Sequence, residues 1–173
     1  MNPDDDPVHP AALDPARILA ECASTFLRRS GPGGQNRNKV ATAVVLDHGP
    51  TGLRAEANES RSQHENRVEA LFRLRLMLAL EIRRAADADR APSDLWRSRL
   101  RGGRININPR HDDFPALLAE ALDFSAARNW DLAEAAGALG CSSTQLLKLL
   151  QVEPKAFARL NEARRGLGLR PLR

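Results

Sequence analysis

Residues 30–39 constrain the fold of this chain more than any other segment, because they favour neither a helix nor a strand. They read Ser-Gly-Pro-Gly-Gly-Gln-Asn-Arg-Asn-Lys. Gly31, Gly33 and Gly34 lack a Cβ, so the backbone there can bend tightly and come close to a partner. The segment therefore predicts an exposed loop that carries a bare amide side chain, Gln35, at its tip.

Fixed positive charge flanks this loop, from Arg28, Arg29, Arg37 and Lys39. A loop that enters a site walled by phosphate needs such charge, so the pattern favours nucleic acid as the target. On its own, a Gly-Gly-Gln tripeptide is typical of an ordinary exposed turn. The surrounding residues have to decide between these two interpretations.

The segments around the loop predict a small antiparallel sheet. A short helix is expected around residues 15–20, after an acidic tail that reaches about Pro10, and an extended stretch around 23–28 leads into the loop. Two strands, 43–47 and 53–57, are separated by a turn rich in Gly and Pro, which predicts a hairpin.

A long helix follows the hairpin. Ser60 or Ser62 can cap it, and Glu65 would lie in its first turn near the positive end of the helix dipole. Apolar residues recur at helical spacing and are expected to lie on the sheet: Val68, Leu71, Phe72, Leu78 and Ile82.

Taken in order, four segments resemble the catalytic domain of class I peptide-chain release factors and of the related single-domain ribosome-rescue hydrolases. They lie within residues 20–86 and are the loop itself, Ala43–His48, Pro50–Leu53 and Arg61–Arg67. Several linked motifs at matching spacing are far more specific than the tripeptide alone.

The resemblance implies that the loop enters the peptidyl-transferase centre and that peptidyl-tRNA is hydrolysed there. Gly33, Gly34 and Gln35 correspond to the catalytic tripeptide. An aminoacyl ester is already reactive, so no Ser, His or Cys nucleophile is required. The backbone N–H of Gln35 would stabilise the developing charge, an effect worth about 3 kcal/mol per donor in other acyl-transfer sites, and its side chain would orient water.

The chain departs from the family pattern at the base of the loop. Arg37 stands where release factors more often have an apolar residue, and Val40 stands where Thr is common. Only about two dozen residues precede the first predicted strand, so we expect no codon-reading domain before the motif and no recognition of stop codons.

The resemblance also implies the partners: large-subunit ribosomal RNA, peptidyl-tRNA and a glutamine methyltransferase that acts on Gln35. Arg61 and Arg67, at the start of the long helix, are RNA-contact candidates, with a capping and salt-bridge cluster around Glu59 and Glu65 as the equal alternative. We expect no cofactor and no metal, because the histidines lack a ligand pattern. We also expect a cytoplasmic monomer with no membrane contact, since the start of the chain resembles neither a secretory signal nor a transit peptide.

Charge is distributed unevenly along the 173 residues, although the net charge is only +4. Residues 24–104 hold 16 basic against nine acidic side chains, whereas residues 1–23 hold one against five. Arg dominates Lys in the middle segment, which suits bidentate phosphate contacts, and a GC-rich genome would produce the same bias.

Residues 87–104 predict a basic linker with an RNA contact. Arg97, Arg99, Arg101 and Arg104 surround one aromatic residue, Trp96. Trp96 could stack on a base, although a Trp that covers a helix end is the commoner outcome.

Residues 105–173 predict a small α-helical domain. A helical region opens at about Asp113, and residues at helix-turn-helix spacing follow: Ala136, Gly140, Leu146 and Leu149. Ser142 or Ser143 would cap the second helix, and Pro154 would start a third. The near-neutral charge of this region favours a ribosome or protein contact over duplex DNA.

The sequence thus predicts an α+β fold with four parts: an acidic tail over residues 1–19, a catalytic domain over 20–86, the linker over 87–104 and the helical domain over 105–173. The predicted function is codon-independent hydrolysis of peptidyl-tRNA on stalled ribosomes. Two alternatives stay open. One is the same hydrolase acting on split large subunits or free peptidyl-tRNA, and the other is a non-catalytic RNA- or DNA-binding protein whose glycine loop is a phosphate clamp.

Overall fold

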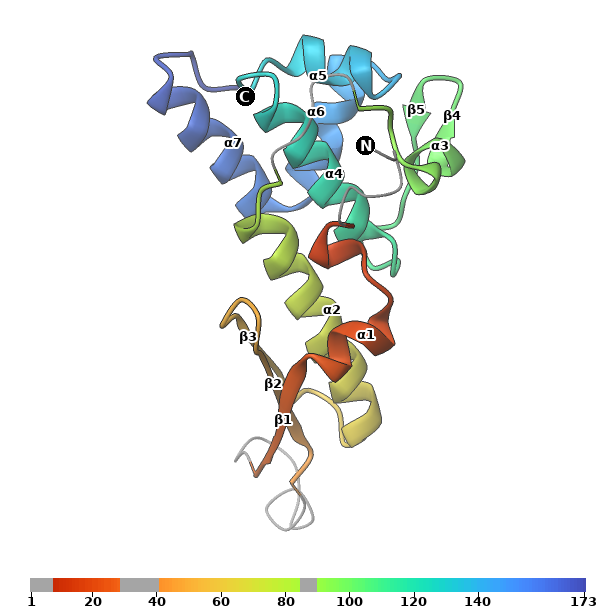
Figure 1. Ribbon diagram of the computed structural model, residues 1–173, viewed down its shortest axis with the longest axis vertical. Coiled ribbons are helices and arrows are strands. Elements are labelled where there is room, and N and C mark those ends of the chain that lie inside the picture. Colours follow the sequence, from red (N-terminus) through yellow and green to blue (C-terminus); the bar gives the residue numbers. More distant parts are fainter. Residues whose placement is uncertain (1–7, 29–40, 85–89) are drawn as a thin grey trace, which may run out of the picture. The chain divides into compact units, whose positions relative to one another are not determined.

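The computed structural model describes residues 8–28, 41–84 and 90–173 (Figure 1). They show a mixed fold of a small antiparallel sheet and several helices. Two compact units can be distinguished: one is Leu13–Leu78, and the other joins the residues up to Ala12 with Ala79–Arg173. Within the described ranges, no helix is long and apolar enough to cross a membrane. The predicted domain boundaries stay predictions.

The first unit contains the predicted sheet. Helix α1 (Pro15–Ala20) begins where the Asp14 carboxylate accepts a hydrogen bond from the Ala16 N–H at 2.8 Å. It leads into β1 (Cys22–Leu27), which pairs antiparallel with β2 (Ala43–His48), and β2 pairs with β3 (Arg54–Ala57). The three predicted strands are therefore confirmed.

Strand β2 is central because its neighbours hydrogen-bond to both of its edges. Residues Ala43–Leu46 are buried on both faces of the strand, whereas the edge strand β1 is exposed along most of its length. The turn from β2 to β3 is closed by the Gly52 N–H, which donates to the His48 carbonyl at 2.8 Å, and Gly52 adopts a φ of +69°. A positive φ favours glycine, so this residue fixes the hairpin turn.

Helix α2 (Gln63–Glu81) follows the sheet. Its buried face within the first unit repeats every four residues, at Asn66, Ala70, Leu74 and Leu78. Val68 lies between two positions of that stripe, so it points to the opposite side, and 53% of it is exposed. The prediction that Val68 packs on the sheet is therefore wrong, because the polar residue Asn66 and not Val68 begins the buried stripe.

Arg73 ties this helix to β3. Its Nη1 donates to the Glu56 carbonyl at 2.7 Å, while its other nitrogens bind the Glu59 and Glu69 carboxylates at 2.7 and 3.0 Å. A guanidinium presents several donors in a fixed fork, so one side chain can hold a strand, a loop and a helix together.

The second unit is organised around α4 (Phe114–Ala126), which is buried on nearly all sides. It packs against η2 (Pro10–Ala12), α5 (Leu132–Ala138), α6 (Ser143–Val152) and α7 (Pro154–Gly166). A helix that is apolar all around must be enclosed by other elements. The predicted helices after Asp113 are thus present, whereas an independent all-α domain over residues 105–173 stays a prediction.

Helices α5 and α6 have the predicted helix-turn-helix features. Ala136 is 1% exposed, Leu146 is fully buried, and Gly140 in the turn has a φ of +71°. The Ser142 hydroxyl caps α6 by accepting a hydrogen bond from the Gln145 N–H at 3.3 Å. The sequence pattern therefore identified this pair of helices and its turn.

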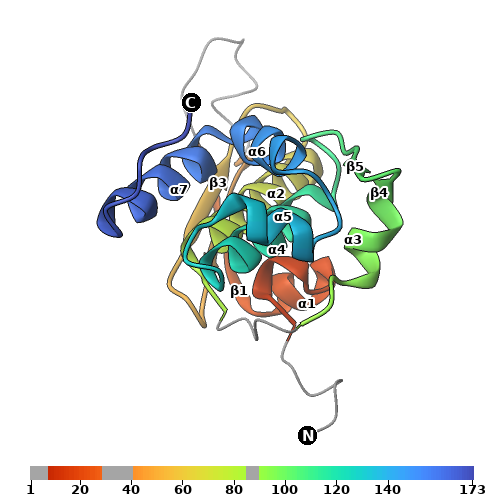
Figure 2. The same ribbon diagram turned by 90° about the horizontal axis from the view of Figure 1, so that it is seen from above.

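Part of the predicted linker is folded. It contains α3 (Asp94–Arg99) and a hairpin of β4 (Leu100–Arg101) and β5 (Arg104–Ile105), which lie at the side of α4 and α6 (Figure 2). Trp96 is fully buried, and its Nε1–H donates to the Leu139 carbonyl at 2.8 Å. Stacking of Trp96 on a base is therefore excluded in this fold, and the packing alternative is the one observed.

His9 lies in the segment that the sequence assigns to an acidic tail, yet it is only 7% exposed. Its Nδ1 accepts a hydrogen bond from the Ala11 N–H at 3.0 Å, so the ring proton is on Nε2, which faces the Ile82 carbonyl at 3.2 Å. Asp123 is nearby and binds Arg83 at 2.8 Å. Burial, reinforced by Arg83, Arg84 and Arg90, lowers the pKa of His9 to about 4. Burial also raises the pKa of Asp123 to about 6.

The low pKa of His9 predicts a pH-dependent contribution to stability. Between pH 6.5 and 4 the unfolded chain binds a proton on His9 that the folded chain does not, so this contribution is lost as the pH falls. Asp123 has the opposite sign, since its raised pKa lets the folded state bind a proton first. In urea unfolding, the stability difference between wild type and His9→Gln should shrink by up to about 3 kcal/mol from pH 6.5 to pH 4.

The exposed Val68 supplies the control for this experiment, because Val68→Gln changes no titratable group and should change stability equally at both pH values. A difference between wild type and His9→Gln that stays constant over the same range would show that His9 is protonated as easily in the fold as in the unfolded chain.

Candidate functional site

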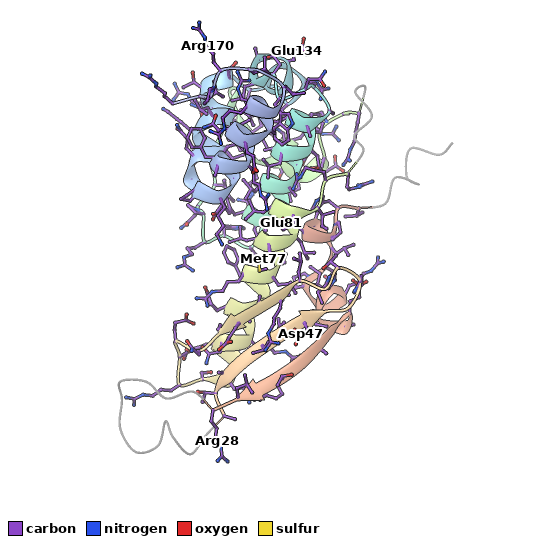
Figure 3. The ribbon with its side chains drawn as sticks, turned by 90° about the vertical axis from the view of Figure 1, so that its left-hand side faces the viewer. Arg28, Asp47, Met77, Glu81, Glu134 and Arg170 are labelled. Atoms are coloured by element: carbon purple, nitrogen blue, oxygen red, sulfur yellow. The ribbon has the colours of Figure 1, made fainter. Side chains whose placement is uncertain are left out.

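The candidate site begins where β1 ends and β2 starts. Leu27 and Ala43 are paired in the antiparallel register, so the glycine loop connects the two strands at one end of the sheet. Arg28 follows β1 at this end, and its exposed side chain points away from the sheet (Figure 3). The predicted catalytic residues Gly33, Gly34 and Gln35, and the predicted RNA contacts Arg29, Arg37 and Lys39, lie outside the described residues.

Asn66 fixes the chain where it leaves the loop. Its Nδ2 donates to the Thr42 carbonyl and to the Ser60 carbonyl, both at 2.8 Å, while its Oδ1 accepts from the Ser60 N–H at 2.9 Å. Only 1% of this residue is exposed. Both donors and the acceptor of one buried amide are thus used to join the loop exit, the segment after β3 and helix α2.

Gln63 adds a second bond to the same segment, since its Nε2 donates to the Ala41 carbonyl at 3.1 Å. The start of α2 is itself capped by the Ser62 hydroxyl, which accepts from the Glu65 N–H at 3.3 Å, and the Ser60 hydroxyl binds the Glu65 carboxylate. The first turn of α2 is therefore a rigid support for the residues that lead into β2.

Arg61 and Arg67 flank this support and are both exposed. Neither arginine forms an ion pair with a described acid: Glu59 binds Arg73, and Glu65 accepts a hydrogen bond from the Ser60 hydroxyl. The capping cluster predicted here thus exists, but the amide and hydroxyl side chains form it and the arginines do not. Arg28 follows β1, and Arg61 and Arg67 lie beside Gln63 and Asn66, which bond Ala41 and Thr42.

His48 lies at the other end of the sheet. Its Nδ1 is 2.7 Å from the Thr51 hydroxyl and its Nε2 is 3.1 Å from the Glu21 carboxylate. Cys22, its partner across the register, is five residues from Leu27, which is roughly 17 Å along a strand. The sequence missed the Glu21 contact because the two residues are far apart in the chain. This row of side chains joins α1 to the hairpin turn, at the end of the sheet opposite Leu27 and Ala43.

The four arginines of the second candidate cluster belong to the other compact unit and are not equivalent. Arg97 binds Asp94 in the same helix, and Arg99 binds Asp113, with Nε 3.1 Å from the carboxylate. Arg101 and Arg104 are exposed on β4 and β5. Two of the four predicted contacts are therefore already engaged within the protein.

Asn66 and Gln63 are the positioning residues whose exact role sequence reasoning did not find. Both stand in the Arg61–Arg67 segment, which the sequence assigned to RNA contact or to capping. The signal that could have separated them is the four-residue spacing of Asn66 from Ala70, Leu74 and Leu78, because it places a polar side chain on the buried face of the helix.

A three-stranded sheet with a basic Gly-Gly-Gln loop between its first two strands, followed by one long helix, defines a release-factor-type domain. The comparison with family models agrees: the RF-1 domain model matches residues 19–112. This match covers more than half of the chain and includes both the loop and the β4–β5 hairpin. The chain belongs to the RF-1 domain family.

Named relatives are release factors. Peptide chain release factor 1 of Verminephrobacter eiseniae is 39% identical over 110 residues, which are 64% of this chain and 28% of that protein. The chloroplastic peptide chain release factor PrfB1 of Arabidopsis thaliana is 48% identical over 65 residues, 36% of this chain and 14% of that protein. Peptide chain release factor 1 of Acidiphilium cryptum is 48% identical over 72 residues, which are 42% of this chain and 20% of that protein.

This chain therefore spans less than a third of the length of these three relatives. The comparison with solved structures finds no match. Residues 113–173 extend beyond the matched family model.

The Asn66 contacts predict a large effect of removing this amide. Asn66→Ala should lower the free energy of unfolding by about 2–4 kcal/mol, because it leaves the carbonyls of Thr42 and Ser60 and the Ser60 N–H without their buried partner. Urea denaturation measures this. His64→Ala, an exposed change in the same turn of α2, is the control, and equal stabilities of the two variants would contradict the assigned role.

Proposed function

We propose that this chain is a codon-independent peptidyl-tRNA hydrolase that acts in the cytoplasm, at the peptidyl-transferase centre of stalled ribosomes. Gly33, Gly34 and Gln35 carry this proposal, because the tripeptide lies within the region matched by the RF-1 domain and joins two strands of the sheet. Release factors are the named relatives, so translation termination is the process that the family membership supports.

Ester hydrolysis requires the protein mainly to position a water molecule and a hydrogen-bond donor. The ester of peptidyl-tRNA is activated, so hydrolysis needs a water molecule at the carbonyl carbon and a donor for the oxygen on which negative charge develops. In this proposal the Gln35 backbone N–H is that donor and the Gln35 side chain orients the water. The bonds from Asn66 and Gln63 to Thr42 and Ala41 support it, since they hold the chain where it rejoins the sheet.

Arginines at the loop base suit a site walled by ribosomal RNA. Arg28, Arg61 and Arg67 are exposed, and guanidinium groups bind phosphates in pairs of hydrogen bonds. Contacts of this kind position a protein on RNA without reading its sequence. They support a hydrolase that recognises the shape of a ribosomal complex and does not require a particular codon.

Substitutions in the tripeptide separate this function from simple RNA binding. Gly34→Ala should lower the rate of peptide release at least about 100-fold with little change in ribosome binding, because a methyl group at this position displaces the backbone donor. Gln35→Ala should also reduce release and keep binding. A phosphate clamp without catalysis would need the glycine amides for binding, would be indifferent to the Gln35 side chain and would release no peptide. Near-normal release by Gly34→Ala would overturn the catalytic assignment.

Codon independence is tested by the release of labelled formyl-methionine from ribosomes that differ only in the A site. We expect equal release with an empty A site on truncated mRNA, a sense codon that has no cognate tRNA, and a stop codon. A rate at stop codons more than tenfold above the others would assign the chain to ordinary termination. Isolated large subunits and free peptidyl-tRNA, assayed in parallel, distinguish the two remaining hydrolase alternatives.

A further inference from the structure

The β4–β5 hairpin carries two arginines directly opposite each other. Arg101 and Arg104 are register partners across the two strands, and both are exposed. Like charges at such positions destabilise a strand pair. Neither arginine forms an ion pair with a described residue, so none of these residues relieves the repulsion.

These two residues flank the hairpin turn directly. Gly102 and Gly103 connect the strands with φ values of +54° and +72°. Two consecutive residues with positive φ are typical of the two-residue hairpin turn that matches the twist of the strands. The arginines therefore flank a short turn of defined backbone conformation and are not part of an irregular linker.

The hairpin is anchored to the helix-turn-helix. Strand β5 packs against α6, and a Cβ on Gly140, in the turn between α5 and α6, would lie 3.2 Å from the Leu100 side chain. Trp96, just before the hairpin, donates to the carbonyl of Leu139, the residue before Gly140. The arginine pair thus stands at a fixed place beside the turn that precedes α6.

Helix α6, which contacts β5, carries exposed polar side chains of its own. Thr144, Lys148 and Gln151 are exposed and follow one another at helical spacing, so they form one stripe. Two acids near the hairpin in sequence, Asp94 and Asp113, bind Arg97 and Arg99. We call Arg101, Arg104 and the α6 stripe the hairpin–α6 surface; its charged members are the cations Arg101, Arg104 and Lys148.

The described residues of the hairpin–α6 surface include no exposed aromatic ring of the kind that single-stranded nucleic acid requires. Proteins that bind single-stranded nucleic acid stack its bases on exposed aromatic rings. In this part of the fold Trp96, Phe114 and Phe124 are buried. An anionic partner with its bases already stacked inside a double helix suits the hairpin–α6 surface better, since only its phosphates and grooves need to be contacted.

We propose that the hairpin–α6 surface binds double-helical RNA, with Arg101 and Arg104 on the phosphates of one backbone and α6 against the adjoining groove. The choice of RNA over DNA rests on the proposed ribosomal function. The phosphate contacts themselves are inferred from the arginine pair and do not depend on that function. Double-stranded RNA is recognised mainly through its shape and backbone. The surface then serves to hold the hydrolase on a ribosomal RNA helix and takes no part in ester cleavage.

The test compares two double variants of the full chain that lose the same charge. Arg101→Gln with Arg104→Gln removes the pair, and Arg97→Gln with Arg165→Gln removes one arginine that Asp94 holds and one exposed on α7. The probe is a labelled 20-base-pair RNA duplex, with the DNA duplex and the single RNA strand of the same sequence as further arms.

The first variant should bind the RNA duplex at least tenfold more weakly at about 0.1 M salt, and the slope of log affinity against log salt should decrease by about 1.4–1.8 for two lost phosphate contacts. The control variant, Arg97→Gln with Arg165→Gln, should bind the RNA duplex with an affinity within twofold of wild type. Arg101→Lys with Arg104→Lys should keep most of the affinity, because a phosphate also accepts a lysine. Equal losses in the two Gln variants, tighter binding of the single strand, or a tenfold preference for the DNA duplex would each overturn the proposal.

Peptide release separates this proposal from the proposed function. The Arg101→Gln, Arg104→Gln variant should reach the wild-type maximal release rate at a higher protein concentration, as expected when only remote binding is lost. If Gly34→Ala releases peptide normally while the RNA duplex results hold, the hydrolase assignment fails and the RNA surface stands. If the Arg101→Gln, Arg104→Gln variant binds the RNA duplex with wild-type affinity, the RNA contact lies elsewhere, whatever the release assay shows.

Discussion

The hydrogen bonds of one buried amide hold together the part of the molecule on which the glycine loop depends. Asn66 binds Thr42 and Ser60 from the first turns of α2, so a helix, a strand entrance and the segment after β3 share one side chain. Sheet pairing alone would fix β2 only as far as Ala43. A loop rich in glycine has a large conformational entropy, and its attachment points must be rigid if its tip is to act at a defined place.

Arginines in both compact units differ in whether a carboxylate binds them. Arg73, Arg83 and Arg99 bind carboxylates and hold elements of the fold together. The arginines proposed to contact RNA at the sheet and on the hairpin are exposed and form no ion pair with a described residue: Arg28, Arg61, Arg67, Arg101 and Arg104. Net charge and regional counts could not make this distinction, because an arginine counts the same whether a carboxylate neutralises it or not.

Much of the fold follows from local patterns. Turn formers at residues 48–52, the caps Ser62 and Ser142, and the glycine at 140 each act within a few residues of their position, so the elements beside them could be predicted. The family resemblance likewise rests on segments close to one another in the chain. Where prediction failed, as at Val68, two helix faces were both partly apolar, and the choice between them required the partner surface.

The sequence by itself determined the order of strands and helices and the family to which the chain belongs, because both depend on the spacing of residues close together in the chain. Only the tertiary structure decided how distant residues are used. It joined His48 to Glu21, His9 to Ile82 and Trp96 to Leu139. These pairs are separated by 27, 73 and 43 residues, and no local rule relates such residues, since burial and hydrogen bonding are settled only when the whole chain is packed.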